Sequence, residues 1–330
     1  MISRAVGTVN VNAALASGGQ RRTIGLMCQL AQDGSGMNAE GKEGRFPLPD
    51  GRILGYAEYG LPDGAPVLFF QGTPSTRLMH PPTTITRELR ARLITVDRPG
   101  FGQSTPAPGR TLLDWPGDVA RLLDSLGVGE FVTAGLSGGG PYVLATAWRL
   151  RDRVRAAAVC GGSGPVEMAG ALRGITLERR LGYLLARHFP GVLRQVVRRY
   201  PDPRRDPARF IRRYTRHNPP ADQRIIAEPE FHRMYLANFA EAQRQGPAAF
   251  AEEVILGARP WGFALEEINV PVHFWQGELD NSTPRGMAEG MAARIPGAKL
   301  TVLPGEGHLF AVGPRWREVL QALLAEGAGA

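Results

Sequence analysis

Residues 131–142 read Phe-Val-Thr-Ala-Gly-Leu-Ser-Gly-Gly-Gly-Pro-Tyr, and this stretch decides the fold. The apolar run 131–134 is typical of a buried strand, and a helical pattern follows from Tyr142 onward. Between them lies a G-x-S-x-G motif centred on Ser137. A strand-to-helix turn this tight leaves no room for side chains beside the serine, and it lifts the hydroxyl above the sheet. The new helix also directs its amide groups at that point. We therefore predict that Ser137 is a nucleophile.

Apolar runs of the same kind recur along the chain, at 67–70, 93–96, 154–159, 272–275 and 300–303. Helical stretches separate most of them, at 112–126, 142–150 and 285–294. A shorter extended pattern begins at Phe46, turns at Pro49-Asp50-Gly51 and ends at Tyr59. Strands that alternate with helices predict right-handed crossovers and a mainly parallel sheet covered on both faces.

The alternation stops between Glu167 and Trp261, where the sequence indicates helices interrupted by many prolines. An insertion between two strands of a parallel sheet is expected to lie over the strand ends, where ligands bind. We therefore predict a helical cap over 167–261 and a core built from 44–166 and 262–326. Residues 1–43 are rich in small residues and have no acidic residue before Asp33. They are either a disordered leader or an over-long start, with Met37 as the true first residue.

The composition is that of an ordinary globular protein of 330 residues, with a net charge of +8. Two cysteines, Cys28 and Cys160, are too few for a disulfide framework or a thiolate metal site. The arginines are spread without interleaved aromatic residues, so we interpret them as a solvated surface and expect no nucleic-acid partner. No apolar run is long enough to cross a membrane, so no membrane partner is expected and a cytoplasmic location is the default.

A serine hydroxyl needs a base to become a nucleophile at neutral pH. His308 follows the run 300–303, in a loop that can reach back to the serine. His273 lies inside a strand run and fits a packed core position better. His188, His217 and His232 fall in the cap, where they could line the pocket. His80 follows the loop after the third strand and is a lesser candidate. The base in turn needs a carboxylate to hold its tautomer, and either Glu278 or Asp280, after the run 272–275, satisfies the chain order serine, acid, histidine.

Taken together, these motifs resemble those of the α/β-hydrolase superfamily, and most closely its bacterial esterases, perhydrolases and C–C bond hydrolases. The resemblance covers 46–324 and includes Asp97-Arg98-Pro99-Gly100-Phe101-Gly102-Gln103-Ser104, which shapes the loop beside the active site in that family. It implies an α/β-hydrolase fold: a mostly parallel eight-stranded sheet flanked by helices, with the cap inserted after strand 6. It also implies that the acid is Asp280, the aspartate of the G-[ED]-x-D-x-x-x-P pattern.

The resemblance further implies an oxyanion hole made by the backbone N–H groups of Thr73 and Gly138. The chain departs from the family beside it, because Gln71-Gly72-Thr73-Pro74 stands where His-Gly-x-P is usual. Gln71 is interpreted as a neutral replacement, and a polar contact from Gln71 to substrate is the alternative. Haloalkane dehalogenases and related epoxide hydrolases need an aspartate at the position of Ser137, so those chemistries are not expected.

The cap is expected to place most of its aromatic residues in its own core and some in the pocket: Phe189, Tyr200, Phe210, Tyr214, Phe231, Tyr235, Phe239 and Trp261. Its densest basic run, Arg198-Arg199, Arg204-Arg205 and Arg212-Arg213, is expected to face water. An acidic partner or a carboxylate-bearing substrate is the alternative for these arginines.

The sequence thus predicts a carboxylesterase-like serine hydrolase with the triad Ser137, Asp280 and His308, acting on a small to medium ester-like substrate. It predicts no cofactor and no metal, and a monomer or homodimer whose partner is a small-molecule substrate. A C–C bond hydrolase or a perhydrolase on the same triad is the nearest alternative. A non-catalytic ligand-binding homologue of the fold is a more distant one.

Overall fold

The computed structural model describes residues 41–168, 170–200 and 202–329. Residues 1–40, which include most of the predicted leader and Met37, lie outside the described residues. The first strand begins at Lys42, four residues before the predicted extended pattern. The last two residues of the predicted leader therefore belong to a strand.

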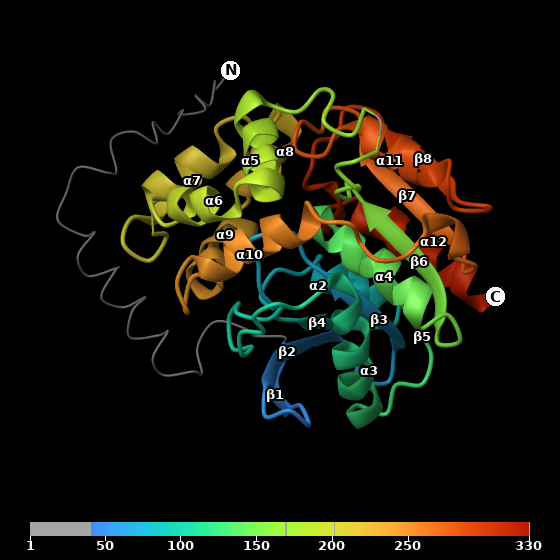
Figure 1. Cartoon of the computed structure of the whole chain (residues 1–330). Coiled ribbons are helices and arrows are strands. Elements are labelled where there is room, and N and C mark those ends of the chain that lie inside the picture. The colour runs from blue at the N-terminus through green and yellow to red at the C-terminus, as the bar shows by residue number, and fades with distance from the viewer. Residues whose placement is uncertain (1–40, 169, 201, 330) are drawn as a thin grey trace, which may run out of the picture. The chain divides into compact units, whose positions relative to one another are not determined.

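Eight strands form one sheet in the order β1-β2-β4-β3-β5-β6-β7-β8 (Figure 1). The strands are β1 Lys42–Pro47, β2 Ile53–Gly60, β3 Ala65–Phe70, β4 Ala91–Val96, β5 Phe131–Leu136, β6 Val154–Cys160, β7 Val272–Gly277 and β8 Lys299–Leu303. Strands β1 and β2 pair antiparallel with their neighbours, and every pairing from β4 to β8 is parallel. The prediction of a mostly parallel eight-stranded sheet is confirmed.

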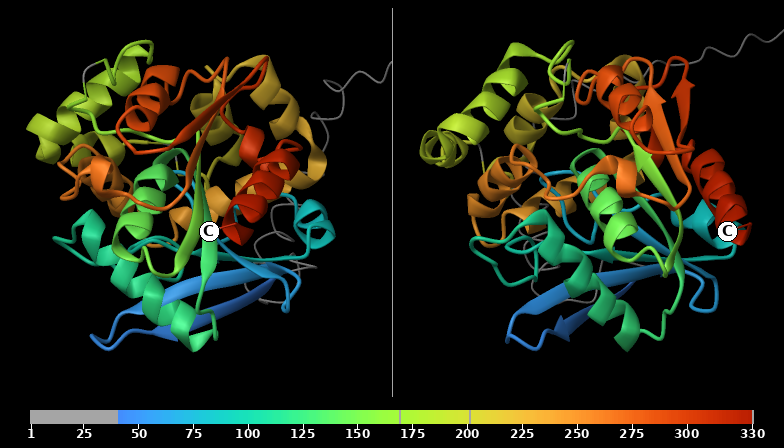
Figure 2. Two further views of the ribbon diagram at one scale, coloured as in Figure 1. Left: turned by 90° about the vertical axis from the view of Figure 1, so that its right-hand side faces the viewer. Right: turned by 45° about the vertical axis from the view of Figure 1, so that its right-hand side comes forward.

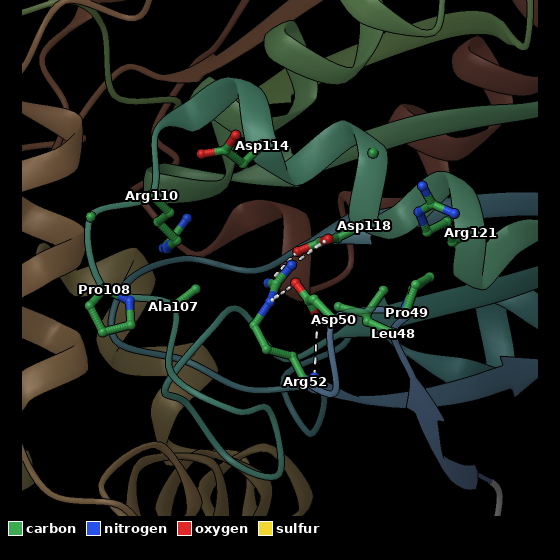
Figure 3. A pocket seen from close by; sticks show the side chains of 12 residues that line it. Leu48, Pro49, Asp50, Arg52, Ala107, Pro108, Arg110, Asp114, Asp118 and Arg121 are labelled. Atoms are coloured by element: carbon green, nitrogen blue, oxygen red, sulfur yellow. Dashed lines mark hydrogen bonds and ion pairs between the residues drawn. The ribbon is translucent and has the colours of Figure 1, made fainter.

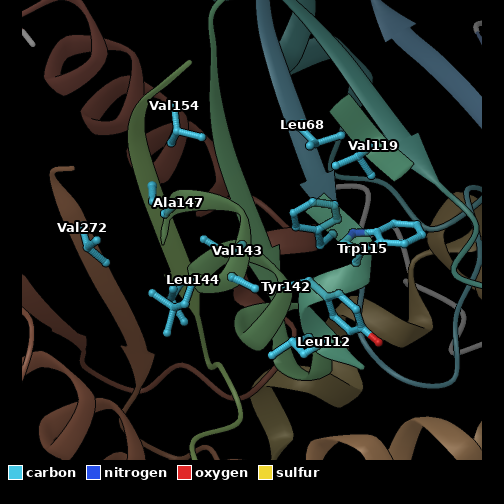
Figure 4. Packing of buried hydrophobic residues seen from close by; sticks show 14 of the residues in the cluster. Leu68, Leu112, Trp115, Val119, Tyr142, Val143, Leu144, Ala147, Val154 and Val272 are labelled. Carbon is cyan, nitrogen blue, oxygen red and sulfur yellow. The ribbon is translucent and has the colours of Figure 1, made fainter. Parts of the chain in front are cut away.

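Helices cover both faces of this sheet (Figure 2). One face carries α3 Trp115–Ser125, α4 Gly140–Arg149 and α11 Arg285–Ala292, and the other carries α2 Thr83–Glu88 and α12 Trp316–Ala328. Figure 4 shows the packing on the first face, where Leu68 of β3, Val119 of α3 and Tyr142 of α4 lie among other buried side chains. The central strands are buried on both faces, which explains their continuous apolar sequences.

Six helices lie between β6 and β7, so the predicted insertion after strand 6 is confirmed. They are α5 Leu177–His188, α6 Pro190–Val197, α7 Pro207–Thr215, α8 Pro220–Ala227, α9 Pro229–Ala242 and α10 Ala248–Gly257. Four of them begin at a proline, which has no N–H to lose at the first helical position. Four of the prolines that suggested broken helices therefore mark where new helices begin. The division into core and cap domains stays a prediction.

Short 3-10 turns complete the described chain, at Leu112–Asp114, Ser137–Gly139, Leu265–Glu267 and Phe310–Val312. Within the described ranges, no helix has both the length and the apolar character that a membrane span requires.

Candidate active site

Ser137 lies immediately after β5, at the sharp turn into α4. Its φ of 57° is in the left-handed region, which costs energy for any residue with a side chain. The turn also packs against β3, because a Cβ on Gly139 would stand only 2.0 Å from the carbonyl oxygen of Phe70. Only glycine fits there. The local sequence thus holds Ser137 in the strained turn that the G-x-S-x-G motif predicts.

The loop after β3 lies against this turn and brings Thr73 close to Gly138. A Cβ on Gly138 would come within 2.4 Å of Thr73 Oγ1 and 3.5 Å of the Thr73 backbone nitrogen. A Cβ on Gly72 would lie 3.3 Å from the Cβ of Ser137. The two predicted oxyanion-hole residues therefore lie side by side, next to the serine.

Arg98 supports the loop after β3 through hydrogen bonds, a role that was not predicted for it from the sequence. The side chain is completely buried, and its guanidinium donates to the carbonyl oxygens of Gln71 and Gly72 at 2.6 Å and to Thr73 Oγ1 at 2.8 Å. Its Nε lies 2.8 Å from a carboxylate oxygen of Glu253 in α10. The signal was present, since Arg98 belongs to the motif that shapes the loop beside the site.

The Gln71 side chain lies inside the protein, directly after β3. It is fully buried, and its amide nitrogen donates to the carbonyl oxygen of Val96 at 2.8 Å. The side chain thus ties the end of β3 to the end of β4. This position favours the interpretation of Gln71 as a replacement that leaves the loop amides in place.

His308 and Asp280 form a buried pair. His308 Nδ1 lies 2.7 Å from Asp280 Oδ2, and the backbone N–H groups of Ser282 and Thr283 donate to Asp280 Oδ1 at 2.8 and 3.1 Å. Glu278 is turned away from this pair, because its carboxylate accepts from the Gly305 N–H at 2.9 Å and is exposed. Of the two acids that the spacing left open, Asp280 contacts the histidine.

Burial and charge act in opposite directions on this pair. Burial raises the pKa of the Asp280 carboxyl, but the His308 charge and the hydrogen bonds from His308 and the loop amides outweigh it, so the pKa is lowered. Burial lowers the pKa of His308, but the charge of Asp280, its hydrogen bond and the charge of Asp222 outweigh it, so the pKa is raised. The pair therefore stabilises an imidazolium, which is the form that a general base takes after accepting a proton.

The end of β6 connects the pair to the serine turn. Gly161 has a φ of 48°, and a Cβ on it would lie 2.9 Å from Asp280 Oδ2 and 3.3 Å from His308 Nδ1. Two residues later, the Ser163 N–H donates to the carbonyl oxygen of Ser137 at 2.9 Å. Among the described residues the Ser137 hydroxyl makes no hydrogen bond to His308. Hydrogen bonds of this kind are often long in ligand-free enzymes.

Asp222 of α8 is a second carboxylate at the histidine, and the sequence reasoning missed it. It is completely buried, and its Oδ1 accepts from the Leu309 N–H at 2.8 Å. Burial raises its pKa, against the opposing charge of His308 and the N–H groups of Leu309 and His308. No local motif marks this aspartate, because it approaches the histidine loop from a helix 86 residues earlier in the chain.

The insertion also holds the loop after β3. The Tyr214 hydroxyl of α7 donates to the Thr73 carbonyl oxygen at 3.1 Å, and Asn238 Oδ1 of α9 accepts from the Thr76 N–H at 2.8 Å. Helices α7 and α9 thus contact the loop after β3, α8 contacts the loop of His308, and α10 contacts Arg98, which supports the loop after β3.

The other candidate histidines lie in different surroundings. His273 is half-buried, bonded to Thr301 Oγ1 at 2.9 Å and stacked on Trp275, as expected for a packed position. His188 and His217 are exposed, and His232 contacts the carbonyl oxygen of Ile226. A nitrogen of the His80 ring lies 2.8 Å from the Pro81 carbonyl oxygen.

A surface pocket between the β1–β2 turn and α3 is separate from this site. Figure 3 shows Arg52 there between Asp50 and Asp118, with which it forms ion pairs at 2.7 Å. None of the predicted site residues lines it. Within the described ranges, no cluster of three or more His, Cys, Asp or Glu side chains is arranged to hold a metal ion.

The prediction that the aromatic residues of the cap form its own core needs two corrections. Phe210, Phe231, Tyr235 and Phe239 are buried, but they share a cluster with strand residues of the sheet instead of forming a core of the cap alone. Phe189 is mostly exposed to solvent, with an exposed fraction of 61%. It directly follows α5 and is not part of the cluster in which α5 and α6 pack against α10.

Comparison with known proteins places the chain among hydrolases. Residues 67–322 match the model of the alpha/beta hydrolase family. A proline iminopeptidase of Neisseria meningitidis is 30% identical over 103 residues, which is 30% of this chain and 33% of that protein. The chain thus aligns with only about a third of the length of that curated relative.

Solved structures resemble the chain over most of its length. A bromoperoxidase from Bacillus anthracis has a TM-score of 0.64 and 21% identity, covering 86% of this chain and 100% of that one. A thermophilic esterase from Thermogutta terrifontis has a TM-score of 0.57 and 24% identity, covering 87% and 99%. These likenesses show the fold, and the family model spans well over half of the sequence. The chain belongs to the alpha/beta hydrolase family.

Proposed function

We propose that this chain is a serine hydrolase that cleaves small to medium ester-like substrates through an acyl-enzyme intermediate. The observation that carries the proposal is the buried Asp280–His308 pair, joined through the end of β6 to the strained turn of Ser137. The esterase among the similar structures supports the choice of ester substrates.

In the first half of the reaction, the Ser137 hydroxyl oxygen attacks the ester carbonyl carbon while His308 Nε2 takes the hydroxyl proton. The N–H groups of Thr73 and Gly138 donate to the oxyanion that forms. Asp280 accepts from His308 Nδ1–H and stabilises the imidazolium. When the carbon–oxygen bond to the leaving group breaks, His308 returns the proton to the departing alcohol.

In the second half, a water molecule attacks the acyl-enzyme and gives its proton to His308. The tetrahedral intermediate then collapses, the acid leaves, and Ser137 recovers its proton from His308. Asp222 does not touch the reacting atoms in this scheme. It is a positioning residue, which holds the loop of His308 through the Leu309 N–H and adds a negative charge near the imidazolium.

The direct test is hydrolysis of p-nitrophenyl acetate, butyrate and octanoate. Ser137→Ala and His308→Ala should each lower kcat by roughly 10⁴-fold or more, because the triad acts as a unit. Ser125→Ala, which removes a hydroxyl from α3, is the matched control and should leave the rate unchanged. Full activity in either triad variant would overturn the assignment, and no activity of the folded wild-type protein on all three esters would overturn the substrate class.

The acid is tested separately with a pair of conservative variants. Asp280→Asn should lower kcat by roughly 10⁴-fold, because the amide no longer holds the reactive tautomer of His308. Glu278→Gln should have little effect, because its contact is with the Gly305 N–H, which the amide oxygen can still accept. The reverse order of these two effects would exchange the roles of the two acids.

A further inference from the structure

Large apolar side chains exposed to solvent gather on one part of the insertion. In the part of the chain that the structure describes, seven large hydrophobic residues are exposed, and six of them belong to α5, α6 or the residue between these helices. The six, called the α5–α6 surface below, are Leu177, Leu181, Leu184, Phe189, Val192 and Val196. Leu177 is 82% exposed. A cluster of exposed apolar side chains is typical of an interaction site, because a surface that only faces water has no need of them.

The spacing of these residues defines one face on each helix. Leu177, Leu181 and Leu184 stand four and three positions apart on α5, which places them in one row. A different face of the two helices is already used, because Ala186, Leu193 and Val197 pack against α10. Each helix therefore has one apolar face buried against the protein and a second with no partner among the described residues. Both views of Figure 2 show α5 and α6 at the outer edge of the insertion.

Arginines surround this surface. Residues 173–216 contain thirteen arginines and three acidic residues, a formal charge of +10. The whole chain carries +8, so the rest of it has a net charge of −2. Several of these arginines are exposed and form no ion pair within the described ranges: Arg173, Arg179, Arg180, Arg198 and Arg199.

The surface is linked to the candidate active site through α7. Glu178 of α5 forms ion pairs with Arg213 and Arg216, and the carbonyl oxygen of the next residue, His217, accepts a hydrogen bond from Asn281, beside Asp280. Burial and, to a smaller degree, the positive charge of Arg179 oppose the raised pKa of His308. The same charge acts on Tyr214 and Tyr235, which belong to the aromatic cluster of α7 and α9. Arg179, two residues after Leu177, is therefore near enough to influence the catalytic histidine.

The positive charge around the α5–α6 surface limits which partner can bind there. A second copy in an isologous contact would bring the same arginines face to face, which costs energy. Residues 1–40 have three arginines and two acidic residues, so they offer no net negative charge either. An occupant that is both apolar and anionic satisfies the leucines and the arginines at once.

We propose that the α5–α6 surface binds an anionic phospholipid surface, with its apolar side chains at the boundary of the acyl chains and its arginines among the phosphates. This departs from the expectation of no membrane partner, which rested on the lack of a spanning segment. The protein would lie on the lipid surface without crossing the bilayer, and the lipid would be close to the candidate active site.

The test is co-sedimentation with vesicles, using the Ser137→Ala variant so that no lipid is hydrolysed and the result is independent of the proposed reaction. Vesicles of phosphatidylcholine and phosphatidylglycerol in equal parts should bind the protein, and vesicles of phosphatidylcholine alone should bind it at least tenfold more weakly. The binding should also fall as sodium chloride is raised, since the arginines act through charge.

Paired variants assign the binding to the surface. Leu181→Asp with Phe189→Asp should reduce binding at least tenfold, whereas Leu279→Asp, at the one exposed large hydrophobic residue outside the α5–α6 surface in the described chain, should not. Arg180→Gln with Arg199→Gln should weaken binding by about fivefold per arginine, and Arg121→Gln with Arg151→Gln should not. All these side chains are exposed, so each variant should keep its thermal unfolding midpoint.

Two results would overturn the proposal. One is equal binding, or none, to neutral and anionic vesicles. The other is a concentration-dependent dimer in analytical ultracentrifugation that Leu181→Asp with Phe189→Asp dissociates while no vesicle binding is seen, which would make the surface an interface between copies.

Discussion

His308 stands between two carboxylates of different origin, Asp280 from the loop after β7 and Asp222 from α8. Both negative charges favour the protonated imidazole, against burial and the charge of Arg179. The proposed reaction needs the neutral imidazole, so kcat/KM should rise with pH and reach half its maximum above the ordinary histidine pKa of about 6.5.

Replacing Asp222 by asparagine should shift this rising limb to lower pH. The change removes a negative charge that favours the imidazolium, while the asparagine oxygen can still accept from the Leu309 N–H. Measuring kcat/KM against pH for the wild type and Asp222→Asn checks the shift. Asp202→Asn, at a cap carboxylate paired with Arg204, is the control and should leave the profile in place. A lowered melting temperature with an unshifted profile would mean that Asp222 is structural only.

At the scale of elements, α10 is joined to the core by a buried charge cluster. Glu253 contacts Arg98 at 2.8 Å, forms an ion pair with Arg110, and accepts from the Tyr142 hydroxyl at 2.7 Å. Since Arg98 also donates to the carbonyl oxygens of Gln71 and Gly72 in the loop after β3, α10 and that loop share one support.

Glu253→Gln should therefore destabilise the protein by about 3–5 kcal/mol, because it leaves the buried Arg98 without its counter-charge. The neighbouring Glu252→Gln breaks an exposed pair with Arg194 and should cost about 0–1 kcal/mol. Urea unfolding of the two variants measures both values. Equal, small effects would show that Arg98 finds another counter-charge.

The helices of the insertion also show what a pattern of apolar residues leaves open. The sequence of α5 and α6 predicts helices with apolar faces, but both helices have more apolar residues than one buried face can use. Phe189 was therefore expected in the core and is exposed. Which face of a helix packs depends on what the rest of the chain places beside it.

At the scale of the whole molecule, the candidate site draws only on residues between Gln71 and Leu309, all of them in the compact unit Lys42–Ala330. A chain that begins at Met37 should therefore keep both its esterase activity and its melting temperature.

A chain that begins at Pro49 should lose stability, since it lacks β1, which pairs with β2 along six residues, and Glu43, which pairs with the buried Arg77. Activity assays and thermal unfolding of both truncations provide the check. Loss of activity in the chain from Met37 would mean that the first 36 residues take part in the function.

Local patterns in the sequence predicted the alternation of strands and helices, the insertion and the serine turn, because each depends on short-range chemistry. A strand buried on both faces must be apolar throughout. Position 139 must be glycine, because a Cβ there would lie 2.0 Å from the carbonyl oxygen of Phe70. Such demands leave local patterns, at 131–142 above all.

Only the tertiary structure decided which charges meet. Asp222 and Glu253 lie in the insertion, far in the sequence from the groups that they contact, and a buried charge is tolerated wherever the fold supplies its partner. The apolar residues of α5 and α6 likewise look the same in sequence whether they are buried or exposed. Partners that come together only on folding leave no local pattern, so these contacts had to be seen in three dimensions.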